Sequence, residues 1–124
     1  MNVVDSSAWL EFFADGPNAA AFAKPIEATR TLVVPTISLY EVFKRILQLR
    51  GENDALRAAA AMEQGTVVNL DRALALAAAP LAIAHKLPMA DALILATARK
   101  YHATLWTQDG DFQGLGDVRY FAKS

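Results

Sequence analysis

The stretch TLVVPTISLYEVF (residues 31–43) decides the fold, because a β-branched run leads directly into a helical pattern. Residues 31–34 favour a strand, since β-branched side chains fit a pleated surface, and Pro35 ends the run. From about residue 38 to residue 50, apolar residues recur three and four positions apart, and Gly51 is placed to end this helix. The stretch therefore predicts a strand followed by a long helix.

The same alternation of strands and helices extends to both ends of the chain. Further β-prone runs cover residues 2–4, 66–70, 104–107 and 118–121. Helical spacing and capping residues predict further helices over residues 8–13, 18–27, 52–64, 71–85 and 88–101. Short strands that alternate with helices indicate a parallel sheet covered by helices on both faces.

Serines and prolines mark the limits of these helices. Ser6 or Ser7 is placed to cap the first helix of the chain. Pro25 should end or bend the helix at residues 18–27, because proline cannot continue the hydrogen-bond ladder. For the same reason, Pro80 should kink the helix at residues 71–85 or split it in two.

Length and composition fit a cytoplasmic protein that forms one domain over residues 1–124. The chain is 54% hydrophobic, which is ample for a buried sheet covered by helices. It has no cysteine, which excludes disulfides and Cys-ligated metals and is typical of a reducing compartment. No apolar run approaches the ~20 residues of a membrane span, and no signal core follows the N-terminus. The net charge of −1 does not by itself indicate nucleic-acid binding.

Four acidic residues lie where successive strands and helices should meet, at Asp5, Glu41, Asp91 and Asp109. Asp5 follows the first strand and Asp109 the fourth, while the other two lie in the first turns of helices. Sites in parallel sheets form beyond the carboxyl ends of the strands, so all four side chains can reach one rim. Carboxylates that gather raise one another's pKa, and a hard divalent cation removes that penalty. The pattern predicts a metal-dependent acidic site.

Each acidic residue also has a simpler explanation. Asp5 could cap the first helix, and Asp91 could be favoured by the helix dipole alone. Ser38 and Glu41 match a capping box, and Asp109 opens an ordinary turn dipeptide. These explanations do not account for the apolar neighbours of Glu41 and Asp91, where an unpaired charge is costly. The combined pattern therefore favours a shared site.

The four acidic residues lie within short segments that read VDSSA, SLYEV, MADALI and TQDGDF, at residues 4–8, 38–42, 89–94 and 107–112. In this order, and in a chain of this length, the segments resemble the PIN-domain ribonucleases, in particular the VapC toxins of type II toxin–antitoxin pairs. The resemblance spans essentially the whole chain. It implies a PIN-like three-layer α/β/α sandwich with a four- to five-stranded parallel sheet.

The resemblance also implies an activity. It is that of an endoribonuclease that needs Mg²⁺ or Mn²⁺, with the metal held by Asp5, Glu41, Asp91 and Asp109. Secondary metal ligands or hydrogen-bond donors would be Ser6, Thr107 and Asp111. A metal-activated water would attack the phosphodiester in line and leave 5′-phosphate and 3′-hydroxyl ends. The implied partners are an RNA substrate, an inhibitory VapB-like antitoxin and a second copy in a homodimer.

An acidic pocket binds RNA only if basic side chains compensate its charge. Arg45 lies one helical turn after Glu41, a spacing that permits a shared side of the helix. Arg99 lies two turns after Asp91 in the same manner. We therefore expect both arginines to contact phosphates. The simpler explanations are solvated helix faces and, for Arg45, an ion pair with Glu41.

Two other functions fit parts of the pattern. A PIN-like module that binds RNA or protein without cleaving would not require the intact set of acidic residues. A receiver-type signalling domain would require paired acids near the first strand, whereas Asp5 stands alone there. It would also require a lysine after a late strand, and none follows residues 104–108 directly. His85 and His102 lie outside the acidic segments, so histidine-based RNA cleavage is disfavoured.

Overall fold

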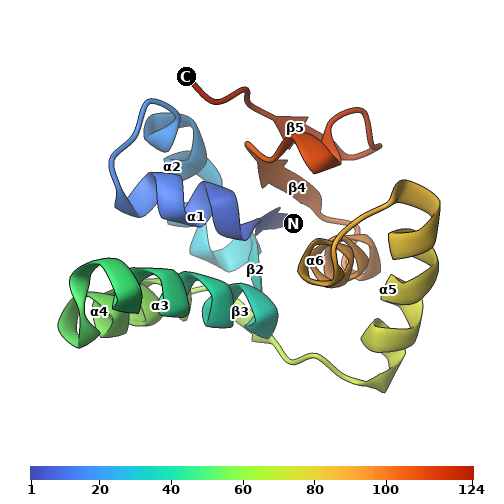
Figure 1. The fold of residues 1–124 in the computed structure, drawn as a ribbon, viewed down its shortest axis with the longest axis horizontal. Helices are drawn as coiled ribbons and strands as arrows, with labels where there is room; N and C mark the ends of the chain where they lie inside the picture. The colour runs from blue at the N-terminus through green and yellow to red at the C-terminus, as the bar shows by residue number, and fades with distance from the viewer.

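Strands and helices alternate along the chain in the computed structural model, which describes all of residues 1–124 (Figure 1). The strands are β1 (Asn2–Val4), β2 (Leu32–Pro35), β3 (Thr66–Val68), β4 (Thr104–Thr107) and β5 (Val118–Tyr120). The helices are α1 (Ser6–Phe13), α2 (Ala19–Glu27), α3 (Thr36–Arg50), α4 (Glu52–Met62), α5 (Arg72–His85) and α6 (Met89–Lys100). Two short 3₁₀ helices are η1 (Thr29–Thr31) and η2 (Gly110–Phe112). The predicted order of strands and helices is confirmed.

The five strands form one sheet in the order β3-β2-β1-β4-β5, and every pairing is parallel. The chain runs outward from β1 to β2 and β3, and then crosses over to β4 and β5 on the other side of β1. Right-handed connections that run in opposite directions place their helices on opposite faces of the sheet. β1 and β4 are therefore neighbours at a topological switch point, where open parallel sheets bind ligands.

Strand residues alternate between two apolar cores, as the period of two in a strand requires. Val3, Val33 and Leu105 belong to a cluster with residues of α5 and α6. Val4 and Val34 belong to a second cluster with residues of α1 to α4. Figure 1 shows these two groups of helices on either side of the sheet. The predicted three-layer α/β/α sandwich with a parallel sheet is confirmed.

Neither internal proline ends its helix. α2 continues to Glu27, two residues past Pro25, and α5 is one helix with Pro80 inside it. Of the outcomes predicted for these prolines, the end of the helix at Pro25 and the split at Pro80 are therefore wrong, and a bend or kink at either residue stays a prediction. Pro80 leaves the carbonyl of Leu76 without its helical donor, and both residues are exposed, so water can satisfy this carbonyl.

α3 begins at Thr36, with Pro35 at its N-cap, which is two residues before the predicted start. Ser38 therefore lies inside the helix, where it is fully buried and its hydroxyl has no hydrogen-bond partner. Because Ser38 does not cap the helix, the capping-box interpretation of Glu41 is wrong.

None of the helices is by itself long and apolar enough to cross a membrane. α5 and α6 meet the length and composition criteria only when taken together, and they are bent by 115° relative to each other. Residues 92–98 of α6 are buried in the core of the fold, which accounts for their apolar composition.

Candidate functional site

Asp5 lies where β1 ends and α1 begins, and only 2% of it is exposed. Its Oδ1 accepts hydrogen bonds from the Ala8 N–H at 3.0 Å and from the Ser7 hydroxyl at 2.8 Å. Its Oδ2 accepts a hydrogen bond from the Thr107 hydroxyl at 2.8 Å. Asp5 therefore caps α1, in place of the serines expected there, and also ties the end of β4 to the end of β1.

Thr107 extends this network from the sheet into the loop after β4. Its fully buried hydroxyl accepts the Asp109 N–H at 2.9 Å while it donates to Asp5. Asp109 caps η2, because its Oδ1 accepts the Asp111 N–H at 2.9 Å. The threonine singled out in the sequence thus connects Asp5 to Asp109 through one hydroxyl group.

Asp91 lies in the first turn of α6 and is half-buried. The carboxylates of Asp91, Asp109 and Asp111 offer oxygens that all lie within 4.8 Å of one another. Three carboxylates at this separation repel one another unless protons or cations compensate them. Oxygen ligands of this kind are those that hard divalent cations prefer.

Glu41 reaches the site from α3. Its Oε1 accepts a hydrogen bond from the Ser6 hydroxyl at 2.6 Å. Since Ser6 directly follows Asp5, this bond joins α3 to the start of α1. The serine predicted to support the site therefore positions Glu41.

Burial and mutual repulsion raise the pKa of two of these carboxyl groups. The pKa of Asp91 rises to about 7, first because burial removes the group from water, and then because of the charges of Asp109, Asp5, Asp111 and Glu41. The pKa of Asp5 rises to about 6, mainly through burial, although its hydrogen bonds lower the pKa in part. The structure thus brings the four predicted acidic residues and Asp111 to one site.

The two predicted arginines lie in different places. Arg45 lines a groove between α1 and α3, together with Leu10 and Phe13, toward the C-terminal ends of both helices. Arg99 lies beside α5, near the C-terminal end of α6. Eight helical residues, about 12 Å at ~1.5 Å per residue, separate it from Asp91. Neither arginine hydrogen-bonds to an acidic side chain or is among the charges that shift the pKa of Asp5 and Asp91, although Arg45 follows Glu41 by one helical turn.

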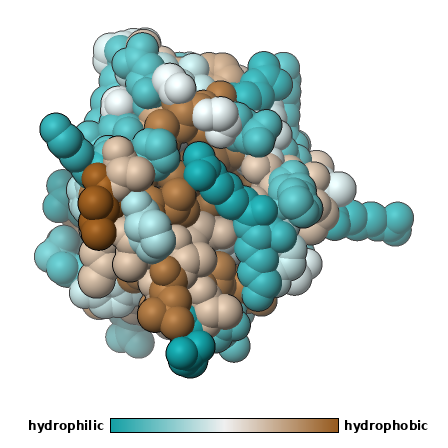
Figure 2. Space-filling view, turned by 90° about the vertical axis from the view of Figure 1, so that its right-hand side faces the viewer, coloured by the Kyte–Doolittle hydropathy of each residue, from teal (hydrophilic) through white to brown (hydrophobic).

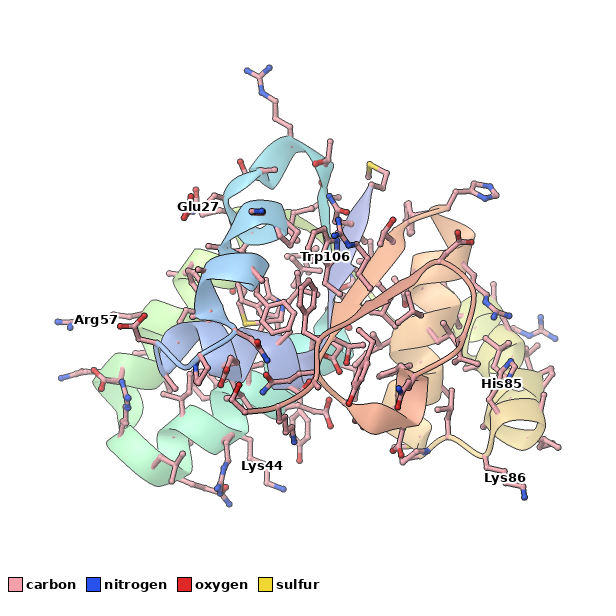
Figure 3. The ribbon with its side chains drawn as sticks, turned by 90° about the horizontal axis from the view of Figure 1, so that it is seen from above. Glu27, Lys44, Arg57, His85, Lys86 and Trp106 are labelled. Carbon is pink, nitrogen blue, oxygen red and sulfur yellow. The ribbon has the colours of Figure 1, made fainter.

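The histidines make no contribution to the acidic site. His85 ends α5 at the edge of the molecule (Figure 3), and His102 is exposed between α6 and β4. Neither residue is a hydrogen-bond partner of the acidic side chains or shifts the pKa of Asp5 or Asp91. The carboxylates are thus the titratable groups that define the site.

Ser7, Asn18 and Gln108 contact the site, although the sequence assigns them no role in it. Ser7 is only two residues from Asp5, so its hydrogen bond to Asp5 is a local contact. Gln108 is 8% exposed, and its amide oxygen accepts a hydrogen bond from Asn18. Asn18 and Gln108 are 90 positions apart in the chain, so no local pattern could have paired them.

Solved structures of toxins share this fold. A chain of a toxin–antitoxin complex from Klebsiella pneumoniae matches with a TM-score of 0.80 and 23% identity, covering 96% of each chain. VapC20 of Mycobacterium tuberculosis, a toxin that cleaves the sarcin–ricin loop, matches with a TM-score of 0.78 and 22% identity, over 96% of this chain and 99% of VapC20. VapBC2 of Rickettsia felis, bound to promoter DNA, matches with a TM-score of 0.74 and 12% identity, over 98% and 97%.

At these identities the structures establish the fold alone, and a search of curated protein sequences finds no match to this chain. The family assignment comes from the sequence of the chain itself. The family model of the PIN domain matches residues 3–118, a range that contains all of the acidic residues described above. This chain therefore belongs to the PIN-domain family.

Proposed function

We propose that this protein is a VapC-like endoribonuclease that cleaves RNA phosphodiester bonds with the help of Mg²⁺ or Mn²⁺. The observation that carries the proposal is the meeting of Asp5, Glu41, Asp91 and Asp109 at the carboxyl ends of β1 and β4. Membership of the PIN-domain family supports the same activity. Residues 1–124 would act as one PIN-like domain in the cytoplasm.

The side chains present fit a hard divalent cation. They supply only oxygen ligands, and the pKa values of Asp5 and Asp91 are raised first by burial and then by neighbouring carboxylates, with no basic group among the causes. Asp91 and Asp109 would hold the ion, with Asp111 as a further ligand and the other two carboxylates beside them. When bound, the ion supplies an activated water and charge stabilisation at the phosphate.

The hydroxyl groups fix the acidic side chains before any substrate arrives. Ser6 holds Glu41, while Ser7 and Thr107 each bind a different oxygen of Asp5. A carboxylate held at both oxygens cannot rotate away from the site. This preorganisation reduces the reorganisation that metal and substrate binding would otherwise require.

Cleavage of RNA by the purified protein tests the proposal directly. We expect cleavage with Mg²⁺ or Mn²⁺, none in excess chelator, and products with 5′-phosphate ends, because a water rather than the ribose hydroxyl attacks. Full cleavage in chelator, or products with cyclic phosphate ends, would overturn the mechanism.

Arg45→Ala should weaken RNA binding to many sequences by a similar factor. If Arg45 contacts one phosphate, the slope of log K against log salt should fall in magnitude by about 0.7 for single-stranded RNA. Filter binding at several salt concentrations measures this slope. Arg99→Ala is the matched control, since the structure places Arg99 away from the acidic site. An unchanged slope for Arg45→Ala would remove it from the RNA contacts.

An exposed apolar face on α5 supports a homodimer. Leu76 and Ile83 are 55% and 82% exposed, and Met89 at the start of α6 is 73% exposed. Figure 2 shows hydrophobic atoms gathered on the side of the molecule that carries α5. Exposed apolar patches commonly mark interfaces, so we propose that a second copy covers this face. Sedimentation of the concentrated protein as a monomer would contradict this.

The proposed inhibitor is a VapB-like antitoxin. Two of the similar structures are toxin–antitoxin assemblies, which supports a partner of this kind. A cognate antitoxin should bind the purified protein and stop RNA cleavage. Binding that leaves cleavage unchanged would contradict the inhibitory role.

A further inference from the structure

The turn between α1 and α2 is joined to the loop that carries Asp109. The side-chain amide of Asn18 donates one hydrogen bond to Oε1 of Gln108 at 3.0 Å and another to the carbonyl of Ala122 at 3.0 Å. An amide nitrogen has two hydrogens, so one side chain can serve both acceptors. Gln108 directly precedes Asp109. The hydrogen bond from Asn18 therefore meets the acidic loop at the residue next to Asp109.

Asn18 is itself held in place by α1. The Glu11 carboxylate accepts the Asn18 N–H at 2.8 Å. A Cβ atom at Gly16 would displace this carboxylate, so the glycine leaves Glu11 room to reach across the turn. The turn between the two helices therefore presents Asn18 in a defined position.

The acidic loop is also held by the segment after β5. The Phe121 N–H donates to the Thr107 carbonyl at 2.9 Å. The Phe121 ring packs against Phe22 of α2 and stacks on Trp106, with ring centroids 5.3 Å and 6.0 Å away. Figure 3 shows Trp106 at the centre of the molecule. The loop is thus anchored to the core at Thr107, whereas Gln108 depends on Asn18.

We propose that Asn18 is a positioning residue of the acidic site, which acts through Gln108 to hold Asp109 and Asp111 against Asp91. The inference rests on the proposed metal-dependent function. Three carboxylates within 4.8 Å repel one another, so the loop must be held against that repulsion. Without Asn18, the nearly buried amide oxygen of Gln108 would lack a partner, and the loop would shift to hydrate it.

The test measures Mn²⁺ binding by the purified full chain, for example by electron paramagnetic resonance. Asn18→Ala and Gln108→Ala should each weaken Mn²⁺ binding about tenfold, as is typical of groups that orient metal ligands. The double variant should bind no more weakly than either single variant, because both substitutions break the same hydrogen bond. Asn53→Ala is the control, since Asn53 is exposed on α4, and it should bind Mn²⁺ like the wild type.

Thermal unfolding of the same variants separates positioning from folding. A lower Tm for Asn18→Ala with unchanged Mn²⁺ affinity would show a structural role alone and overturn the inference. Losses of affinity that add in the double variant would also overturn it, because Asn18 would then act by another route. If Asn18→Ala does not fold, wild-type affinity in Gln108→Ala has the same consequence. Failure of the wild type to bind Mn²⁺ would instead overturn the metal site itself, and this inference with it.

Discussion

Asp91→Asn should lower the rate of RNA cleavage about 10³-fold and leave the protein folded. Asparagine keeps the shape of the side chain but removes the charge on which Asp109, Asp5, Asp111 and Glu41 all act. A metal site that loses this carboxylate loses one of its ligands, because Asp91 offers an oxygen within 4.8 Å of those of Asp109 and Asp111. Single-turnover cleavage at saturating Mn²⁺ measures the loss in the chemical step.

Asp117→Asn provides a matched control for this substitution. Asp117 is exposed before β5 and has a φ of 60°, a left-handed conformation that asparagine adopts well. We expect it to cleave RNA at the wild-type rate. Equal cleavage by the wild type and Asp91→Asn would show that the acidic site does not perform the reaction.

The position of Asp91 illustrates what a sequence can predict about such a site. A strand of β-branched residues and an amphipathic helix are local patterns, and their alternation requires parallel strands with right-handed connections. That topology alone brings Asp5 and Asp109 to the ends of neighbouring strands, although 104 positions separate them. Glu41 and Asp91 join them because each lies in an early turn of a helix that begins at the same edge.

The parts that the sequence did not predict depend on packing between distant segments. The sequence around Asn18 predicts only a turn, and the contact between Asn18 and Gln108 forms only in the folded chain. Spacing along α6 suggested a role for Arg99, but the helix axis carries this residue away from the site. Pro80 is expected to break a helix, yet α5 continues, because Leu76 is exposed and water can satisfy the carbonyl that loses its donor. Local rules therefore predicted the frame of the site, and long-range packing determined its support.

The metal-free protein should be less stable at pH 8 than at pH 5. The pKa of Asp91 is about 7 in the folded protein against an ordinary value of 3.8, and that of Asp5 is about 6. At a pH between the ordinary pKa and the raised pKa of each group, the folded chain binds a proton that the unfolded chain has released. The free energy of unfolding therefore falls as pH rises. The loss starts above the ordinary pKa and is complete above pH 7. Because Asp91 is only half-buried and water screens it, we expect a total loss of about 2 kcal/mol.

Urea unfolding in chelator at pH 5 and pH 8 measures this loss, and two comparisons assign it to the acidic site. Asp91→Asn should flatten the pH dependence and be more stable than the wild type at pH 8, because the asparagine side chain carries no charge to repel.

Mn²⁺ at about 100 times its Kd should stabilise the wild type by about 2.7 kcal/mol at pH 8. It should stabilise Asp91→Asn much less, since a ligand is missing. A free energy of unfolding that rises from pH 5 to pH 8 in chelator would show that the clustered carboxylates do not strain the fold. Asp91 thus opposes folding when the metal is absent and is required for cleavage when the metal is present. Both effects are expected of a carboxylate that serves as a metal ligand.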